Sequence, residues 1–274
     1  MESSGTLLSE KELEISERHS GIIELPDDTE IGAPFATVAG LDDPIIEIAI
    51  TPNRGDCLGV RGIARDLAAA GLGVLKPYGE EKINGSFKCP IHWQRDFPEG
   101  GGNASPIVVG RCFRGVVNGP SPKWLQDRLN AVGLRPISRL VDISNYISYD
   151  LGRPMHIFDS GKLTGDLTMR FAEKGEKITA LDENVYELDD TITVISDEVG
   201  VQSIGGLMGG LSSGCTESTT EVFLEVALFD PVRTATAGRK LGIESDARYR
   251  FERGVDAQSV IWGTEAASSM ILSL

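Results

Sequence analysis

The chain has 274 residues, of which 41% are hydrophobic and 24% charged, and its formal net charge is −15. It contains neither the run of roughly 18 apolar residues that a membrane-spanning helix needs nor the basic and apolar segments of a signal peptide. Proteins that hold nucleic acid chiefly by its phosphates are basic, so the charge argues against a general RNA-binding protein.

The first part of the chain is predicted to contain short elements joined by loops. Residues 1 to about 40 are loop-rich, with one short strand over residues 21–26. Alternating apolar side chains predict a second strand over residues 45–50, followed by a turn at residues 52–56. A helix comes next and ends at Gly71 or Gly73. Its apolar stripe consists of Val60, Ile63, Ala64 and Leu67.

Two further helices are predicted after a linker over residues 78–88 and a glycine-rich loop at residues 100–103. Ser121 is the expected cap of the first helix, with Pro122 at its first position and Gly133 at its end. Its predicted buried face consists of Trp124, Leu125, Leu129 and Val132. The second helix is expected over residues 138–150 and is ended by Gly152.

Strand patterns follow these helices, over residues 166–172, 191–196, 201–207 and 221–229. Because helices come before strands and do not alternate regularly with them, the fold class we predict is α+β. The last residues place apolar side chains at helical spacing up to the final Leu274, without a cap. We therefore expect the chain to be a fragment of a larger protein.

The segment 238–256, GRKLGIESDARYRFERGVD, combines paired charges with glycines at both sides. It predicts a turn at Leu241-Gly242, then a short helix capped by Ser245 or Asp246 and stopped by Gly254. Asp246 and Arg250 stand four residues apart, the favourable order for a helical ion pair. The alternative is an ordinary surface helix with paired charges.

Glu225 is the most informative single residue. In the predicted strand, Val222, Leu224, Val226 and Leu228 share one face, whereas Phe223, Glu225 and Ala227 share the other. A carboxylate in an apolar strand is costly unless it meets a partner. It either faces water at a sheet edge or lies in a pocket that awaits a hydrogen-bond donor.

Other candidate sites are weaker. His156, beside Met155 and Phe158, is either a structural histidine or a site residue. The glycine run IGGLMGG, residues 204–210, lacks the order of a phosphate-binding loop and instead favours a hairpin that a ligand approaches closely. A hydrolytic triad of Ser245, His156 and an aspartate has no supporting motif.

Cysteines and histidines are scattered along the chain, so we predict neither a disulfide framework nor a zinc site or other metal site. The cysteines are expected to be buried free thiols in a reducing compartment. These residues are Cys57, Cys89, Cys112 and Cys215, and His19, His92 and His156.

Five separated motifs carry a resemblance to a known family: TPNRGDCLGVRG, SNY…LGRPMHIFD, GGLMGG, FLEVALF and SDARYRFERGVD. In this order they resemble the bacterial phenylalanine–tRNA ligase beta subunit. The resemblance implies three segments: residues 1–40 as the tail of an oligonucleotide-binding-type module, residues 41–84 as part of a small strand-helix domain with a linker, and residues 85–274 as an α+β editing domain.

The resemblance also implies roles for individual residues. Glu225 would accept the hydroxyl group of tyrosine, and Gly209 and Ala247 would line the space for its ring. Around the ester and a bound water it places His156, Ser144, Asn145 and Ser245. Ser144 and Asn145 match a Thr-Asn pair of the family, and Ser245 stands where threonine is common.

The implied activity is post-transfer editing, the hydrolysis of tyrosine esterified to tRNA(Phe). The implied partners are the tRNA 3′ end with its amino acid and an alpha subunit, in a cytoplasmic heterotetramer of two alpha and two beta subunits, with no membrane. The fragment would need no cofactor, whereas ATP and Mg²⁺ would serve charging by the full enzyme. The alternatives are a non-catalytic scaffold that orients tRNA and is inactive when isolated, and a general small-ester hydrolase, for which no nucleophile motif is present.

Overall fold

The computed structural model describes residues 7–15, 18–78 and 82–274. They belong to two compact units, Met1–Ile45 and Ile46–Leu274. These units do not test the roles assigned to the three predicted segments, which stay predictions. In the first unit, the described residues contain one short helix, α1 (Phe35–Val38), and only Ser9 is buried.

The two strands predicted near the N-terminus are wrong. Residues 21–26 make no ladder, although Ile23 N–H donates to Leu8 O at 2.9 Å. Residues 45–50 are extended, but no described segment pairs with them. Alternation marks a potential strand, and the strand forms only where a neighbouring strand supplies hydrogen bonds.

Most helices of the second unit match the predictions in place, whereas α5, which begins at Pro231, was not predicted. Gly71 and Gly152, both with positive φ, follow the ends of α2 and α4 as expected. The helices are α2 (Val60–Ala69), α3 (Lys123–Ala131), α4 (Arg139–Leu151), α5 (Pro231–Leu241), α6 (Asp246–Phe251) and α7 (Ser259–Ser273).

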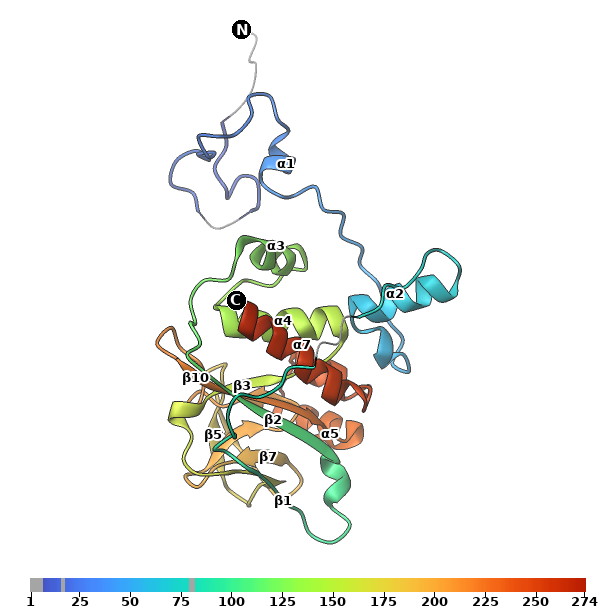
Figure 1. Ribbon diagram of the computed structural model, residues 1–274, viewed down its shortest axis with the longest axis vertical. Helices are drawn as coiled ribbons and strands as arrows, with labels where there is room; N and C mark the ends of the chain where they lie inside the picture. Colours follow the sequence, from blue (N-terminus) through green and yellow to red (C-terminus); the bar gives the residue numbers. More distant parts are fainter. Residues whose placement is uncertain (1–6, 16–17, 79–81) are drawn as a thin grey trace. The chain divides into compact units, whose positions relative to one another are not determined.

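Three sheets make up the rest of the second unit (Figure 1). One has three antiparallel strands in the order β2-β10-β3, with bounds Ile107–Arg114, Glu221–Leu228 and His156–Asp159. Another has the order β1-β4-β7-β8-β9, with bounds Trp93–Asp96, Leu167–Phe171, Thr193–Ser196, Val201–Ile204 and Met208–Gly209. The third is the hairpin of β5 (Lys177–Thr179) and β6 (Val185–Glu187). The predicted fold class, α+β, is confirmed.

The two faces of β10 pack against different layers. Val222, Leu224 and Val226 join one core with residues of α3, α4 and α7, the helices that cover one side of this sheet in Figure 1. Phe223 and Ala227 join a second core with residues of β3, β4 and β7. The predicted alternation along this strand is therefore confirmed, and Glu225 lies on the side of the second core.

Three details of the predicted helices are wrong. Of the predicted buried face of α3, Leu125 and Leu129 are buried, but Trp124 and Val132 are exposed. Ser121 does not cap α3; its hydroxyl donates to Asp142 Oδ2 at 2.6 Å, and Pro122 takes the cap position. The stripe of α2 is not buried either, since Val60 and Leu67 remain 62% and 48% exposed. Ile63 and Ala64 of the same stripe are partly buried.

The segment 238–256 forms the predicted turn and helix. Gly242 has a left-handed conformation, and Ser245 is the cap, with its Oγ accepting from Arg248 N–H at 3.0 Å. Asp246 pairs with Arg250 at 2.9 Å and Arg248 with Glu252 at 3.0 Å. These charges stabilise the turn by pairing with each other.

The prediction of free cysteines is wrong for one pair. Cys89 and Cys112 form a disulfide, with their Cα atoms 5.6 Å apart. The residues are 23 positions apart in the chain, and the tertiary fold brings Cys89 beside strand β2. Cys57 and Cys215 are free.

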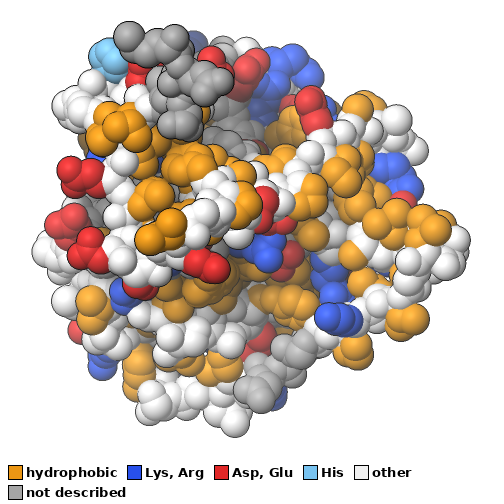
Figure 2. Space-filling model, turned by 90° about the horizontal axis from the view of Figure 1, so that it is seen from above, with side chains coloured by type: hydrophobic (Ala, Val, Ile, Leu, Met, Phe, Trp, Pro, Cys, Tyr) orange, Lys and Arg blue, Asp and Glu red, His pale blue; other side chains and the backbone are white. Residues whose placement is uncertain are grey.

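On the face shown in Figure 2, Lys and Arg side chains are scattered among Asp and Glu and do not gather into one patch. Among the helices that the structure describes, none has the length and apolar character needed to span a membrane.

Candidate functional site

A small cavity opens beside the central strand of the three-stranded sheet. Its volume is about 60 Å³, and it is lined by Glu225 from β10, His156 from β3, Gly209 from β9 and Ala247 from α6, together with apolar side chains such as Met155 and Phe229. Four of the seven predicted site residues therefore meet at one place, although they are up to 91 positions apart in the sequence (156 to 247).

Glu225 lies in the middle of a central strand, paired with Gly110 on β2 and with His156 on β3. Its side chain is 4% exposed, so the possibility of a carboxylate facing water at a sheet edge is excluded. Burial raises the pKa of Glu225 to about 7, although the positive charge of Arg153 opposes this rise. Among the described residues, none donates a hydrogen bond to this carboxylate.

His156 lies edge-on to Phe158, with the two ring centroids 4.3 Å apart. Burial lowers the pKa of His156 to about 4, so the imidazole is neutral near pH 7. Its Nε2 is buried and finds no hydrogen-bond partner within the described part of the chain. Such an unpaired atom is available to a ligand or a water.

Gly209 is required by the position of His156. A Cβ atom built on Gly209 would lie 2.2 Å from His156 Cε1 and 2.7 Å from Nε2. The absence of a side chain at Gly209 therefore lets the imidazole reach the cavity. This contact gives a physical reason for one of the glycines in the β8–β9 hairpin.

Ser245 does not line the cavity, although its neighbour Ala247 does. The Ser245 hydroxyl donates to Leu207 O at 2.7 Å and accepts from Arg248 N–H. The first hydrogen bond holds the start of α6 against the β8–β9 hairpin, and the second caps the helix. The serine thus shapes the cavity wall through the backbone.

Ser144 and Asn145 lie on α4 and are not among the residues that line the cavity. The Ser144 hydroxyl donates to Val141 O of its own helix at 2.8 Å. The structure therefore does not bring these two residues to the cavity, and their assignment to the ester and water stays a prediction.

Arg153 was missed by sequence reasoning. It is completely buried, and its Nη2 donates to Ala227 O, two residues beyond Glu225 on the same strand. Phe229 and Phe251 were missed as well; they line the cavity and contact each other edge-on, with centroids 5.1 Å apart. For Arg153, the sequence offered one signal: a charged residue between Gly152 and Pro154, in an otherwise apolar stretch.

The segment TPNRGDCLGVRG contacts the rest of the unit through glycine backbones. A Cβ atom on Gly55 would lie 2.3 Å from Gly254 O, and one on Gly59 would lie 2.3 Å from Gly152 N. Arg250 donates to Leu58 O at 3.1 Å. These contacts fix the segment next to the ends of α4 and α6.

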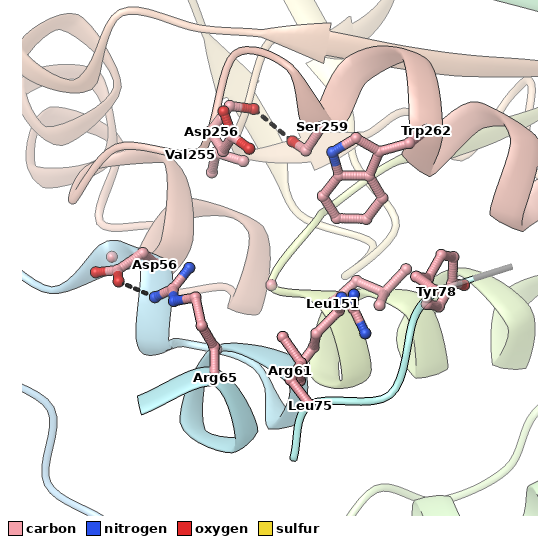
Figure 3. A pocket seen from close by; sticks show the side chains of 13 residues that line it. Asp56, Arg61, Arg65, Leu75, Tyr78, Leu151, Val255, Asp256, Ser259 and Trp262 are labelled. Carbon is pink, nitrogen blue, oxygen red and sulfur yellow. Dashed lines mark hydrogen bonds and ion pairs between the residues drawn. The ribbon is translucent and has the colours of Figure 1, made fainter. Parts of the chain in front are cut away.

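A larger pocket, about 260 Å³, lies between this segment and α7 (Figure 3). Arg61, Arg65, Tyr78 and Trp262 line it, and Arg65 is paired with Asp56. None of the predicted site residues lines this pocket. Its two arginines are balanced by Asp56 and Asp256, so its lining carries no net charge that would select an anion.

One group of described side chains has the spacing of metal ligands: Asp56, Cys57 and Asp66. The guanidinium of Arg54 donates to Asp66 Oδ2 at 2.6 Å and to Asp56 Oδ1 at 3.0 Å. A cation is therefore already supplied by the protein at this position.

Comparisons with known proteins show the family to which the chain belongs. Residues 104–274 match the model of the B3/4 domain. The chain is 54% identical over 274 residues to a phenylalanine–tRNA ligase beta subunit of Mesorhizobium japonicum, and 55% identical over 274 residues to that of Gluconobacter oxydans; each alignment covers 100% of this chain. The chain spans about a third of the length of these relatives, 34% and 33% respectively.

Among solved structures, an N-terminal fragment of the phenylalanyl-tRNA synthetase beta subunit from Pyrococcus horikoshii aligns with 71% of this chain and 60% of its own, at 19% identity and a TM-score of 0.37. That similarity is too low to support an argument. The match of residues 104–274 to the family model, together with the identity over the whole chain, is decisive: the chain belongs to the B3/4 domain family, in the sequence context of phenylalanine–tRNA ligase beta subunits.

Proposed function

We propose that this region hydrolyses the ester between tyrosine and tRNA(Phe), as an editing site within a phenylalanine–tRNA ligase beta subunit. The observation that carries the proposal is the buried, unpaired carboxylate of Glu225 in a cavity that also contains His156, Gly209 and Ala247. A buried acceptor without a donor is costly, and a tyrosyl hydroxyl would supply the missing donor.

The need for such a site follows from the limits of binding selectivity. An apolar pocket built for phenylalanine cannot strongly reject an isostere that adds only a hydroxyl group. A second pocket with a buried acceptor reverses the preference, because phenylalanine leaves this acceptor unpaired. In this proposal Glu225 recognises the hydroxyl, whereas Gly209 and Ala247 leave room for the ring.

The chemistry itself requires little of the protein. An aminoacyl ester is already activated, so holding a water in line with its carbonyl can suffice. His156 is neutral near pH 7, and its free Nε2 can accept from or donate to that water. Ser144, Asn145 and Ser245 are proposed to complete the surroundings of the ester when the tRNA end is bound.

The cavity must widen before a ring can enter. Its volume of about 60 Å³ is well below the roughly 150 Å³ of a cavity that accommodates benzene. Met208 from β9 and Met155 line it and are only partly buried, and methionine side chains adapt readily because of their flexible, unbranched chains. Substrate entry is thus expected to move side chains more than backbone.

The test is a deacylation assay with the full-length beta subunit, purified with its alpha subunit, on Tyr-tRNA(Phe) and Phe-tRNA(Phe). Glu225→Gln removes the charge and is expected to lower the Tyr-over-Phe selectivity by roughly 10- to 100-fold, the equivalent of about 1.5–3 kcal/mol for a hydrogen bond to a charged group. Glu221→Gln is the matched control, because Glu221 lies on the same face of β10 but is exposed. Unchanged selectivity in Glu225→Gln contradicts the proposed hydroxyl recognition.

A second candidate function is a non-catalytic scaffold that orients tRNA for the full enzyme. The small volume of the cavity and the net charge of −15 favour it. The same assay separates the two, since a scaffold predicts no deacylation even in the full assembly. In either case the tRNA phosphates would be held mainly outside these residues, and charging with ATP and Mg²⁺ would take place on the alpha subunit in the cytoplasm.

A further inference from the structure

Arg153 is a completely buried arginine whose Nη2 donates to Ala227 O, two residues after Glu225 on β10, and none of the roles proposed above involves it. It lies in the turn between α4 and β3, three residues before His156. A guanidinium is protonated at neutral pH. Its burial therefore places a positive charge inside the protein, which is costly unless the charge is compensated.

The contacts of Arg153 satisfy only some of its hydrogen-bond donors. Nη2 donates to Ala227 O of β10, and Nη1 donates to Ser259 Oγ of α7 at 3.4 Å, whereas Nε has no partner among the described residues. Its guanidinium also lies over the Phe251 ring, 5.7 Å from the centroid. These are neutral partners, so the compensating negative charge must come from farther away.

Two carboxylates act on Arg153 without forming an ion pair with it in the described structure. Glu225 and Asp256 both oppose the effect of burial, which lowers the pKa of Arg153 to about 10. Asp256 lies in the loop before α7 and lines the pocket of Figure 3. Glu225 lies inside the candidate cavity.

The position of Arg153 depends on a glycine of α7. A Cβ atom on Gly263 would lie 2.9 Å from Arg153 Cγ. Ala227 O holds the other end, on the same strand as Glu225. The arginine is thus held by contacts with α7 and with β10, the strand that carries Glu225.

We propose that Arg153 is a specificity-determining positioning residue: its buried guanidinium keeps Glu225 in the carboxylate form that accepts a tyrosyl hydroxyl. This inference rests on the proposed editing function. Arg153 touches no substrate in this scheme and acts through Glu225. The other titratable group packed against Glu225 is His156 on β3, which is neutral near pH 7 and contributes no charge.

Without Arg153, nothing opposes the burial of Glu225, and its carboxyl should hold a proton at higher pH than in the native protein. A one-unit rise in the titration midpoint of the Glu225 carboxyl lowers the ratio of carboxylate to acid about tenfold at fixed pH. Selectivity for tyrosine requires the carboxylate, so it is lost as the pH falls through that midpoint. The variant should lose it at a higher pH than the native protein.

The experiment measures the ratio of Tyr-tRNA(Phe) to Phe-tRNA(Phe) deacylation between pH 6 and pH 8.5, using the full-length beta subunit with its alpha subunit. In Arg153→Met, the midpoint of the selectivity profile is expected to move up by at least about one pH unit. In Arg153→Lys, which retains a cation, the shift should be smaller. In a Glu225→Gln background, Arg153→Met should leave selectivity unchanged, because the group that it acts through is gone.

Arg250→Met is the matched control for the loss of a buried arginine. Arg250 is 5% exposed and pairs with Asp246, away from the cavity lining. It should lower stability without moving the midpoint. The inference is overturned if Arg153→Met, like Arg250→Met, leaves the pH profile of selectivity as it is in the native protein. It is also overturned if Arg153→Met changes selectivity equally in the native and the Glu225→Gln backgrounds.

A second readout does not depend on deacylation. The Glu225 carboxyl of the 274-residue chain, labelled with ¹³C-glutamate, can be titrated by NMR and assigned by the signal that Glu225→Gln removes. If Arg153→Met does not move this titration midpoint, the inference is overturned, whatever the deacylation assay shows. A midpoint that moves in a protein without editing activity supports the role of Arg153 in ionisation, while the proposed function and the selectivity that depends on it both fail.

Discussion

Gly209→Ala tests the geometry of the candidate cavity most directly. The added Cβ atom would lie 2.2 Å from His156 Cε1, 2.7 Å from Nε2 and 3.0 Å from Nδ1. These are the three nearest atoms, so the whole imidazole must move or β9 must shift. The ring cannot retreat freely, because Phe158, which is completely buried, contacts it edge-on at 4.3 Å.

The cost follows from this crowding. Overpacking of a well-filled interior typically destabilises by about 1–3 kcal/mol. For a domain of this size each kcal/mol lowers Tm by about 2–4 °C. We expect Tm of the 274-residue chain to fall by roughly 2–12 °C. Under the proposed function, hydrolysis of Tyr-tRNA(Phe) by the full-length protein should also be lost, because the imidazole leaves the place proposed for the ester.

Gly200→Ala is the matched control, since a Cβ atom there would meet nothing within 4 Å. The decisive comparison is a double-mutant cycle with His156→Ala, measured by thermal unfolding. Removing the imidazole should abolish most of the cost of Gly209→Ala. An equal cost in both backgrounds would refute the argument that Gly209 exists to admit His156.

Three other predictions concern the same region. Ala247→Trp should fill the cavity and abolish Tyr-tRNA(Phe) hydrolysis while the far-ultraviolet circular dichroism stays native; retained hydrolysis would refute the placement of the ring. His156 has a pKa of about 4 in the folded protein, below its ordinary 6.5, so its contribution to stability is present above about pH 6.5 and is lost as the pH falls toward 4, by up to about 3 kcal/mol. His156→Gln should therefore flatten the dependence of unfolding free energy on pH in this window, and an unaltered slope would contradict the shift. Gly59→Ala should lower Tm by several degrees, because its Cβ atom would lie 2.3 Å from Gly152 N; Gly73→Ala, with open space around it, should be neutral, and similar melting of both would contradict the close backbone packing.

Much of the fold could be predicted where local chemistry decides it. Gly152 and Gly242 end helices because a left-handed residue is needed there, and Ser245 caps α6 through its own hydroxyl. The alternation along β10 gave both faces correctly, because side-chain direction in a strand has a period of two.

The errors arose where a distant part of the chain decides the outcome. Residues 45–50 alternate as a strand should, yet no described segment pairs with them. Ser121 has the sequence context of a helix cap, but its hydroxyl donates instead to Asp142, 21 positions later. Cys89 and Cys112 show no pairing signal, and only the fold brings them together.

The sequence by itself determined the fold class, most helix ends, the two faces of β10 and, through its motifs, the resemblance to a family. Only the tertiary structure decided that Glu225, His156, Gly209 and Ala247 share one cavity and that Ser144 and Asn145 do not line it. It also decided that Arg153 is buried against β10, the strand that carries Glu225. The physical reason is range: propensities, caps and strand alternation depend on neighbours a few residues away, whereas burial and the charge state of a carboxyl depend on groups that folding brings from elsewhere in the chain.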